Sequence, residues 1–234
     1  MNTTNHDDVI IDGGYAPENG QEKIPVCIAS DVSGSMLAMD PCGKRKIDLL
    51  NEGLQQFYNN IASDPVLSQT IKLCLMTFNE TVKVVQKYSL VENFTMPTLT
   101  AGGGTNLEGA VLKIKEEVEA EKQYLDDHGV SRKRAFNIIF CDGQAFVSDQ
   151  TEAMVKQDST GKHYFNQAIG VGADANMAVL DKVSSEGALR MKDAGQFSAV
   201  FRELSNSLGL MANANPDAPA SSSSPFAAWT STSK

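Results

Sequence analysis

The sequence predicts an α/β protein with a mostly parallel, doubly wound central sheet, one antiparallel edge strand, and helices on both faces. Short apolar runs alternate with longer segments whose apolar residues recur every three or four positions, as strands and amphipathic helices do. Two of the strand-like runs are joined only by Asn79-Glu80-Thr81, which is too short for a crossover helix and predicts an antiparallel hairpin. Oxygen-bearing side chains follow several of the runs, at the sheet edge where doubly wound proteins bind their ligands.

The first strand is expected over residues 25–30, because this run is apolar on both faces as a buried parallel strand should be. Residues 36–43 form a connection that Pro41 interrupts. The first helix follows over residues 44–62. Its apolar stripe consists of Ile47, Leu50, Leu54, Phe57 and Ile61.

The hairpin strands are expected over residues 71–78 and 82–88. A loop over residues 89–101, with Pro97, leads to Gly102, Gly103 and Gly104. The second helix is expected over residues 106–127. Its apolar face consists of Leu107, Val111, Ile114, Val118 and Leu125.

The second half of the chain continues the alternation up to a final helix over residues 197–210. The elements expected before it are strands over 134–141 and 164–171, helices over 148–157 and 176–184, and a short strand at Leu189. The stripe of the final helix is Phe197, Val200, Phe201, Leu204 and Leu208. We therefore expect one doubly wound, Rossmann-like domain over residues 23–212.

Both ends differ in composition from this domain. Residues 1–22 are polar and acidic without a sustained period, which predicts a flexible N-terminal arm and no signal peptide. Residues 213–234 are rich in Ser, Pro and Ala and are expected to form a flexible tail. The tail carries Phe226 and Trp229, the only tryptophan, and this aromatic pair is either a docking peptide or part of a disordered segment.

Charge and cysteine usage limit the classes of function. The net charge of −9 argues against nucleic-acid binding, and Lys44-Arg45-Lys46 is read as a solvated face or helix end. No apolar stretch approaches the roughly 20 residues that span a bilayer. Cys27, Cys74 and Cys141 fall in apolar runs, and Cys42 falls in a loop without a Cys-x-x-Cys pattern. We expect a reduced, cytoplasmic protein.

The most informative stretch is Asp31-Val32-Ser33-Gly34-Ser35, directly after the first strand. One carboxylate and two hydroxyls that converge in a tight turn form an oxygen-only set, which suits Mg²⁺ better than a soft metal. Thr105 after the three glycines and Asp142 after the strand over 134–141 supply further oxygens at the same edge. The competing interpretation is that Ser33 or Ser35 caps the first helix, that Thr105 caps the next, and that Asp142 closes a turn.

These three parts, in this order, resemble the metal-ion-dependent adhesion site of von Willebrand factor A-type (VWA) domains. The resemblance implies a VWA fold, Mg²⁺ or Mn²⁺ as the cofactor, and metal roles for Asp31, Ser33, Ser35, Thr105 and Asp142. In this arrangement the hydroxyls bind directly and the carboxylates partly through water. A carboxylate from a protein partner then takes the open coordination position.

Residues 23–212 are more narrowly similar to the bacterial TerY-like subgroup of VWA proteins, which is associated with tellurium resistance. The match is carried by Asn51-Glu52-Gly53-Leu54, Asp64-Pro65, Thr77-Phe78-Asn79, Gly103-Gly104-Thr105 and Ile169-Gly170-Val171-Gly172. It implies a stand-alone interaction module whose partner is a kinase or a PP2C-like phosphatase. The sequence departs from the subgroup at Cys141, where a threonine is usual, and at Gln144-Ala145-Phe146, where Glu-Pro-Thr is frequent.

The resulting hypothesis is a metal-dependent module that binds an Asp or Glu of a protein partner, and not an enzyme. The alternatives are a structural subunit with an idle metal site, or less favourably a metal-dependent phosphatase or a nucleotide-dependent oxidoreductase. An aspartyl-phosphate hydrolase would need a second carboxylate where Ser33 stands, there is no P-loop, and Gly170-x-Gly172 lacks a third glycine. The rim that contacts the partner is expected to include Met36, Leu37, Gly103, Gly104, Gln144 and Phe146.

Overall fold

The computed structural model describes residues 22–191 and 194–213 of the 234-residue chain. The strands are β1 (Ile24–Asp31), β2 (Ile71–Phe78), β3 (Val82–Leu90), β4 (Ala135–Cys141), β5 (Tyr164–Val171) and β6 (Leu189–Met191). The helices are α1 (Lys46–Ser63), α2 (Leu67–Thr70), α3 (Leu107–Asp127), α4 (Asp149–Thr160), α5 (Met177–Val183) and α6 (Ala194–Asn213). Two 3₁₀ turns, η1 (Gly34–Leu37) and η2 (Val91–Asn93), complete the described elements.

The strands form one six-stranded sheet in the order β3-β2-β1-β4-β5-β6. Every neighbouring pair is parallel except β2 and β3, which form the antiparallel hairpin that the short connection predicts. The strand order reverses at β1, which pairs with β2 on one side and with β4 on the other. The crevice beyond the carboxyl ends of β1 and β4 is therefore the topological switch point, where doubly wound sheets bind ligands.

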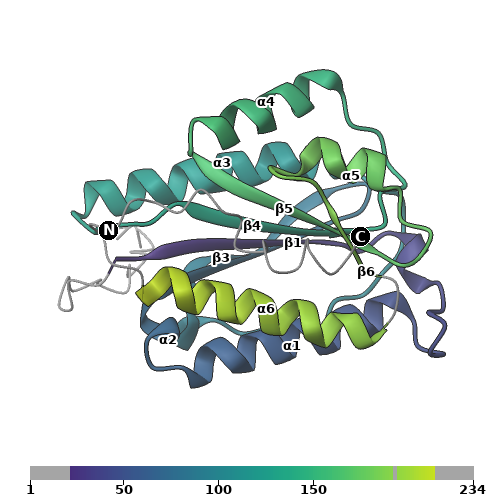
Figure 1. Ribbon diagram of the computed structural model, residues 1–234, viewed down its shortest axis with the longest axis horizontal. Helices are drawn as coiled ribbons and strands as arrows, with labels where there is room; N and C mark the ends of the chain where they lie inside the picture. The colour runs from purple at the N-terminus through teal and green to yellow at the C-terminus, as the bar shows by residue number, and fades with distance from the viewer. Residues whose placement is uncertain (1–21, 192–193, 214–234) are drawn as a thin grey trace, which may run out of the picture.

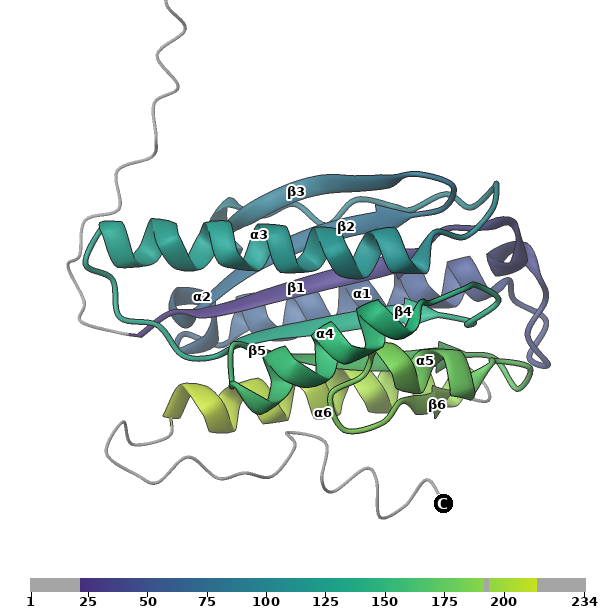
Figure 2. The same ribbon diagram turned by 90° about the horizontal axis from the view of Figure 1, so that it is seen from above.

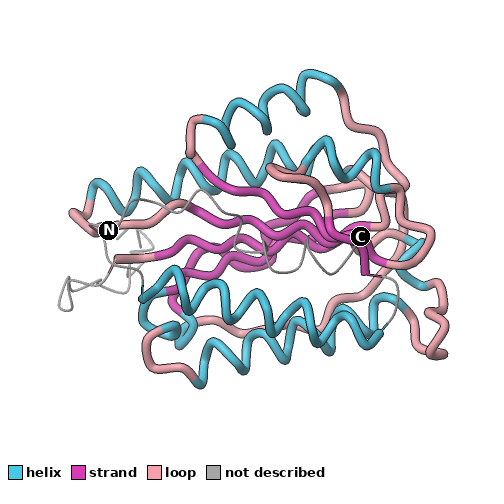
Figure 3. The backbone as a smooth tube through the Cα atoms, viewed as in Figure 1, coloured by secondary structure: helices cyan, strands magenta, loops and turns pink. Residues whose placement is uncertain are grey.

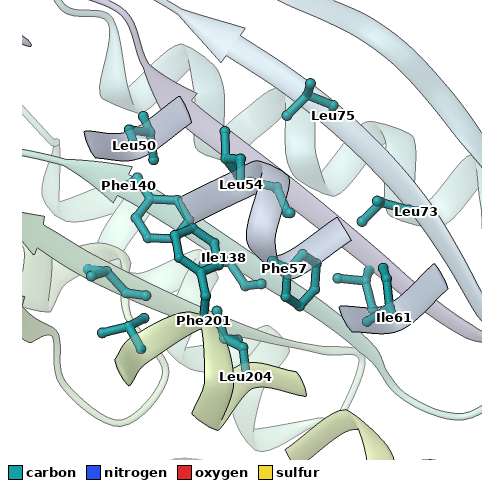
Figure 4. Close-up of a cluster of buried hydrophobic side chains, with 14 of the residues drawn as sticks. Leu50, Leu54, Phe57, Ile61, Leu73, Leu75, Ile138, Phe140, Phe201 and Leu204 are labelled. Atoms are coloured by element: carbon teal, nitrogen blue, oxygen red, sulfur yellow. The ribbon is translucent and has the colours of Figure 1, made fainter. Parts of the chain in front are cut away.

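Helices cover both faces of the sheet, with α3, α4 and α5 on one face and α1, α2 and α6 on the other (Figure 1, Figure 2). The tube in Figure 3 shows the strands as a central layer between the two groups. Two hydrophobic clusters fill the two interfaces, so the central strands are buried on both faces. Figure 4 shows part of the cluster in which Leu50, Leu54 and Phe57 of α1 meet Ile138 and Phe140 of β4 and Phe201 of α6.

The six expected strands and the five expected helices are all observed, with shifts of a few residues at their ends. The sequence reading missed α2, η1 and η2, because a single turn is too short to display a hydrophobic period. The α2 turn is instead set by a local contact, since Asp64 Oδ1 accepts hydrogen bonds from Val66 N and Leu67 N at 2.8 and 3.0 Å.

Most of the arm predicted over residues 1–22 and of the tail predicted over 213–234, including Phe226 and Trp229, lies outside the described residues. Within residues 22–191 and 194–213, none of the helices combines the length and the hydropathy that crossing a bilayer requires. The four cysteines are free: Cys27, Cys74 and Cys141 are buried and Cys42 is exposed, as their positions in strands and a loop predict.

Gly53 sets the distance between α1 and α6. A Cβ at this position would lie 2.2 Å from Cε2 of Phe201, whose ring is fully buried. A glycine inside a helix costs about 1 kcal/mol relative to alanine, so this close packing offsets a poor local propensity.

We expect Gly53→Ala to lower the free energy of unfolding by about 1–3 kcal/mol, because overpacking a full core outweighs the gain in helix propensity. Denaturant unfolding measures the change. Gly209→Ala is the matched control: it lies in α6, a Cβ there meets nothing within 4 Å, and we expect it to be neutral or stabilising. Equal stability of Gly53→Ala and wild type would show that α6 moves aside without cost.

Candidate metal-binding site

Two aspartates meet at the switch point. Asp31 is the last residue of β1 and Asp142 directly follows β4, the strand that pairs with β1. Three atoms lie within 4.8 Å of one another: one carboxylate oxygen of Asp31, one of Asp142, and Cys141 Sγ. All three residues are buried. The structure thus brings together side chains that are far apart in the sequence.

The Asp31–Ser35 loop is held in a tight conformation. Asp31 Oδ1 accepts a hydrogen bond from Ser33 N at 2.7 Å, and the hydroxyls of Ser33 and Ser35 are 2.9 Å apart. Ser33 is buried and Ser35 is half-buried. The three oxygen-bearing side chains therefore converge as the alternate spacing predicts.

The loop that carries Thr105 packs against this loop. Gly102 N donates to Val32 O at 2.7 Å, and Gly34 N donates to Gly103 O at 2.8 Å. A Cβ at Gly34 would lie only 3.3 Å from Gly103 O, so the small residue allows this contact. Thr105 itself is half-buried and lies between this loop and the start of α3.

The capping interpretation is wrong for the two serines and for the threonine. Arg45 precedes α1 without a side-chain cap, and Ser33 precedes η1 without a cap hydrogen bond. Asn106, not Thr105, caps α3, because its side chain accepts from Gly109 N at 2.9 Å. For Asp142 the turn interpretation is correct, since Oδ1 accepts from Gln144 N at 3.2 Å.

The second oxygen of Asp142 tests whether these residues fit a cation. Oδ2 is buried and has no hydrogen-bond partner among the described residues. A buried carboxylate oxygen without a partner raises the free energy of the folded state unless a cation or a hydrogen-bond donor binds it. An oxygen-rich set in which one buried carboxylate oxygen makes no hydrogen bond within the described part of the chain, and lies 4.0 Å from the Lys46 ammonium, fits a hard divalent cation such as Mg²⁺.

Burial governs the ionisation of the residues at the base of the site. Burial raises the pKa of the Asp31 carboxyl, although hydrogen bonds from Cys141 and Ser33 oppose the shift, and the charge of Asp142 adds to it. Burial also raises the pKa of Cys141 well above its usual range, so the residue is a neutral thiol. Its Sγ donates to Asp31 Oδ2 at 3.0 Å, and Cys141 thus acts as a hydrogen-bond donor behind the carboxylate.

The sequence reading missed that two charged residues, Lys46 and Asp174, lie beside the site. Lys46 does begin α1, so the expected helix end is confirmed, but a solvated face is wrong for this residue. Lys46 Nζ lies 3.0 Å from Asp174 Oδ1 and 4.0 Å from Asp142 Oδ2, and the lysine is buried rather than solvated. Its hydrogen bond holds the pKa of the Asp174 carboxyl below its usual range. The expectation of a solvated face holds for Lys44 and Arg45, which form exposed pairs with Glu52 and Asp48.

A third missed residue, Glu80, supports the glycine loop. It lies in the turn between β2 and β3, and its Oε1 accepts from Gly104 N at 3.1 Å. Its carboxylate would be 2.9 Å from a Cβ at Gly103, whose φ of +85° also favours glycine. A lone acidic residue in a hairpin turn carries no signal of this contact in the sequence.

Exposed residues surround the site, with one correction to the predicted rim. Met36 is fully buried in the core and is therefore not part of the rim, because η1 turns its side chain inward. Leu37 and Phe146 are exposed at 43% and 76%, and Met39 at 64% adds a third apolar side chain. Gly103, Gly104 and Gln144 are exposed as expected.

The fold is shared with known proteins. An aerotolerance-related membrane protein from Bacteroides fragilis is 15% identical with a TM-score of 0.52, covering 78% of this chain and 98% of that one. The VWA domain of SpRpn10 is 14% identical with a TM-score of 0.56, covering 78% and 95%. The vWF domain of the pilus tip protein Mfa5 from Porphyromonas gingivalis is 8% identical with a TM-score of 0.61, covering 83% and 98%.

At these identities the likeness concerns the fold alone: the chain has the mixed, Rossmann-like fold of VWA domains. No protein-family model and no curated protein matches the sequence.

Proposed function

We propose that this chain is a protein-interaction module whose binding site is completed by a divalent cation, Mg²⁺ or Mn²⁺. The observation that carries the proposal is Asp142 Oδ2, which is buried beside Asp31 at the switch point of the sheet and has no hydrogen-bond partner among the described residues. Asp31, Ser33, Ser35, Thr105 and Asp142 would hold the ion. The bound ion would supply an electrophilic position for a carboxylate, since hydroxyl ligands leave its charge incompletely neutralised.

The surface around the site supports a protein as the partner. Leu37, Met39 and Phe146 are large apolar side chains that remain exposed beside a polar centre. Exposed apolar side chains around a charged centre are typical of protein interaction sites. The partner would present one Asp or Glu to the ion and an apolar surface to these three residues.

The TerY-like resemblance suggests a narrower proposal for the biological setting. In that setting the partner belongs to a kinase–phosphatase signalling or tellurium-resistance system, and the module acts in the cytoplasm without catalysis. The departure at Cys141 lies beneath the metal site, and the departure at Gln144-Ala145-Phe146 lies at its rim. The first bears on metal binding and the second on the choice of partner, so the two properties are separable.

Acetate is the minimal probe of the carboxylate position. We expect the protein loaded with paramagnetic Mn²⁺ to accelerate the relaxation of the acetate methyl protons in NMR, because the carboxylate binds next to the ion. EDTA should remove the effect. Asp31→Asn, measured at the same total Mn²⁺, controls for acetate that binds free ions.

Partner binding itself should be compared in Mg²⁺ and in EDTA once a partner is in hand. A large loss of affinity in EDTA is the expected result. Equal affinities would mean that the metal site is idle and that the chain acts as a structural subunit through another surface.

A further inference from the structure

Lys46 is placed where a helix does not favour a lysine. It is the first residue of α1, and the positive end of the helix dipole lies at this terminus, so a cation there is electrostatically unfavourable. The side chain is also buried, only 7% exposed, which is rare for lysine unless it is paired with an acid. Neither position in the helix nor burial explains the residue, so its function must come from the acids that it faces.

Lys46 faces two acids: Asp142 at the candidate metal site and Asp174 outside it. Lys46 Nζ is 4.0 Å from Asp142 Oδ2, the oxygen that lacks a hydrogen bond, and 3.0 Å from Asp174 Oδ1. The ammonium group lies over Gly172, where a Cβ would be 2.9 Å from Nζ and where φ is +100°. Glycine at this position therefore leaves room for the lysine between the two carboxylates.

Asp174 belongs to the connection between β5 and α5, which is itself tied to Asp142. Asn176 N donates to Asp142 O at 2.8 Å, and Gln144 Nε2 donates to Asp174 O at 3.4 Å. The acid that draws Lys46 away from Asp142 is thus held in position next to the site. Its side chain is 69% exposed, so it can be changed without disturbing the core.

We propose that Lys46 is a built-in counter-ion of Asp142 that competes with the divalent cation and so sets the affinity of the metal site. The inference deepens the proposed function and rests on it. Without metal, the ammonium compensates the buried negative charge of Asp142. With metal bound, the two positive charges repel each other at short range, and Asp174 retains the ammonium.

Lys46→Met tests the competition, since methionine keeps an unbranched apolar stem without the charge. We expect Mg²⁺ affinity, measured by titration calorimetry, to rise about tenfold or more, because a like charge next to the ion is removed. Lys44→Met is the matched control: it makes the same change in net charge, but Lys44 is exposed and pairs with Glu52. Its effect on affinity should be small because salt screens distant surface charges.

Thermal unfolding gives a second readout that does not depend on calorimetry. In EDTA, Lys46→Met should melt several degrees below wild type, because Asp142 loses its counter-ion. In Mg²⁺ the difference should shrink, so the stabilisation by metal becomes larger than in wild type.

Asp174→Asn provides a variant that should fold even if Lys46→Met does not. Without Asp174 the ammonium has Asp142 as its remaining acidic partner among the described residues, so Mg²⁺ affinity should fall severalfold. In the Lys46→Met background the same substitution should have no effect, which identifies the lysine as the mediator.

The outcomes separate this inference from the proposed function. If wild type binds Mg²⁺ and Lys46→Met binds it equally well, the counter-ion role is wrong and the metal-dependent module stands. If only Lys46→Met binds Mg²⁺, the lysine is the stronger competitor and the inference is supported. If neither binds, both proposals fail.

Discussion

Asp31→Asn should weaken Mg²⁺ binding by about a hundredfold or more and leave the fold intact. Replacing even an outer-shell group typically costs about 10- to 100-fold in metal affinity, and Asp31 is a proposed ligand. Asparagine has the same shape and keeps an acceptor for Ser33 N, which Asp31 Oδ1 now binds at 2.7 Å. Asp31→Ala should lose metal binding equally, and the strands should still fold because the two clusters of apolar side chains bury them without the ion.

Titration calorimetry with Mg²⁺ measures the effect, and circular dichroism checks the fold. Asp48→Asn is the matched control, because it removes the same charge from a partly exposed residue that forms an ion pair only with Arg45 among the described residues. Mg²⁺ affinity that is the same in Asp31→Asn and in wild type would place the ion elsewhere and contradict the assignment of the site.

Lys72→Met should lower the free energy of unfolding by about 3–5 kcal/mol, the cost of breaking one partner of a buried ion pair. Lys72 on β2 and Glu121 on α3 are 4% and 8% exposed, and Nζ lies 2.5 Å from Glu121 Oε1. The variant leaves the glutamate buried without this counter-charge. Denaturant unfolding at neutral pH measures the loss.

The pair offers two controls. Lys72→Met/Glu121→Leu removes both charges and should recover most of the stability, because an apolar pair replaces the ion pair at little net cost. Burial raises the pKa of Glu121, and Lys72 opposes the shift, so the pKa should rise further in Lys72→Met. Because the pKa of the Glu121 carboxyl is raised in the folded state, the free energy of unfolding that is lost at neutral pH is regained as the pH falls below this pKa.

The destabilisation by Lys72→Met should therefore be smaller at about pH 5 than at about pH 8, because Glu121 takes up a proton at a pH near or above the ordinary pKa of glutamate. A pH-independent loss of stability would show that packing of the lysine stem, rather than its charge, carries the effect.

Much of the fold follows from local patterns in the sequence. The apolar period of α1, the continuous apolar runs of β1 and β4, and the three-residue connection between β2 and β3 are each contained within a short segment. They predict the mixed sheet because the helical and strand periods and the length of a connection are properties of neighbouring residues. The convergence of Asp31, Ser33 and Ser35 is equally local, since all three lie in one five-residue turn.

The tertiary structure decided which partners certain side chains have, whereas the sequence shows these side chains only as charged or apolar. Lys46 and Lys44 are equivalent in a basic run, yet one is buried against Asp142 and Asp174 and the other is exposed. Met36 and Leu37 are adjacent apolar residues, yet one fills the core and the other lies on the rim. Such outcomes depend on which strands the sheet places side by side, because burial and charge compensation are set by neighbours in space and not by neighbours in sequence.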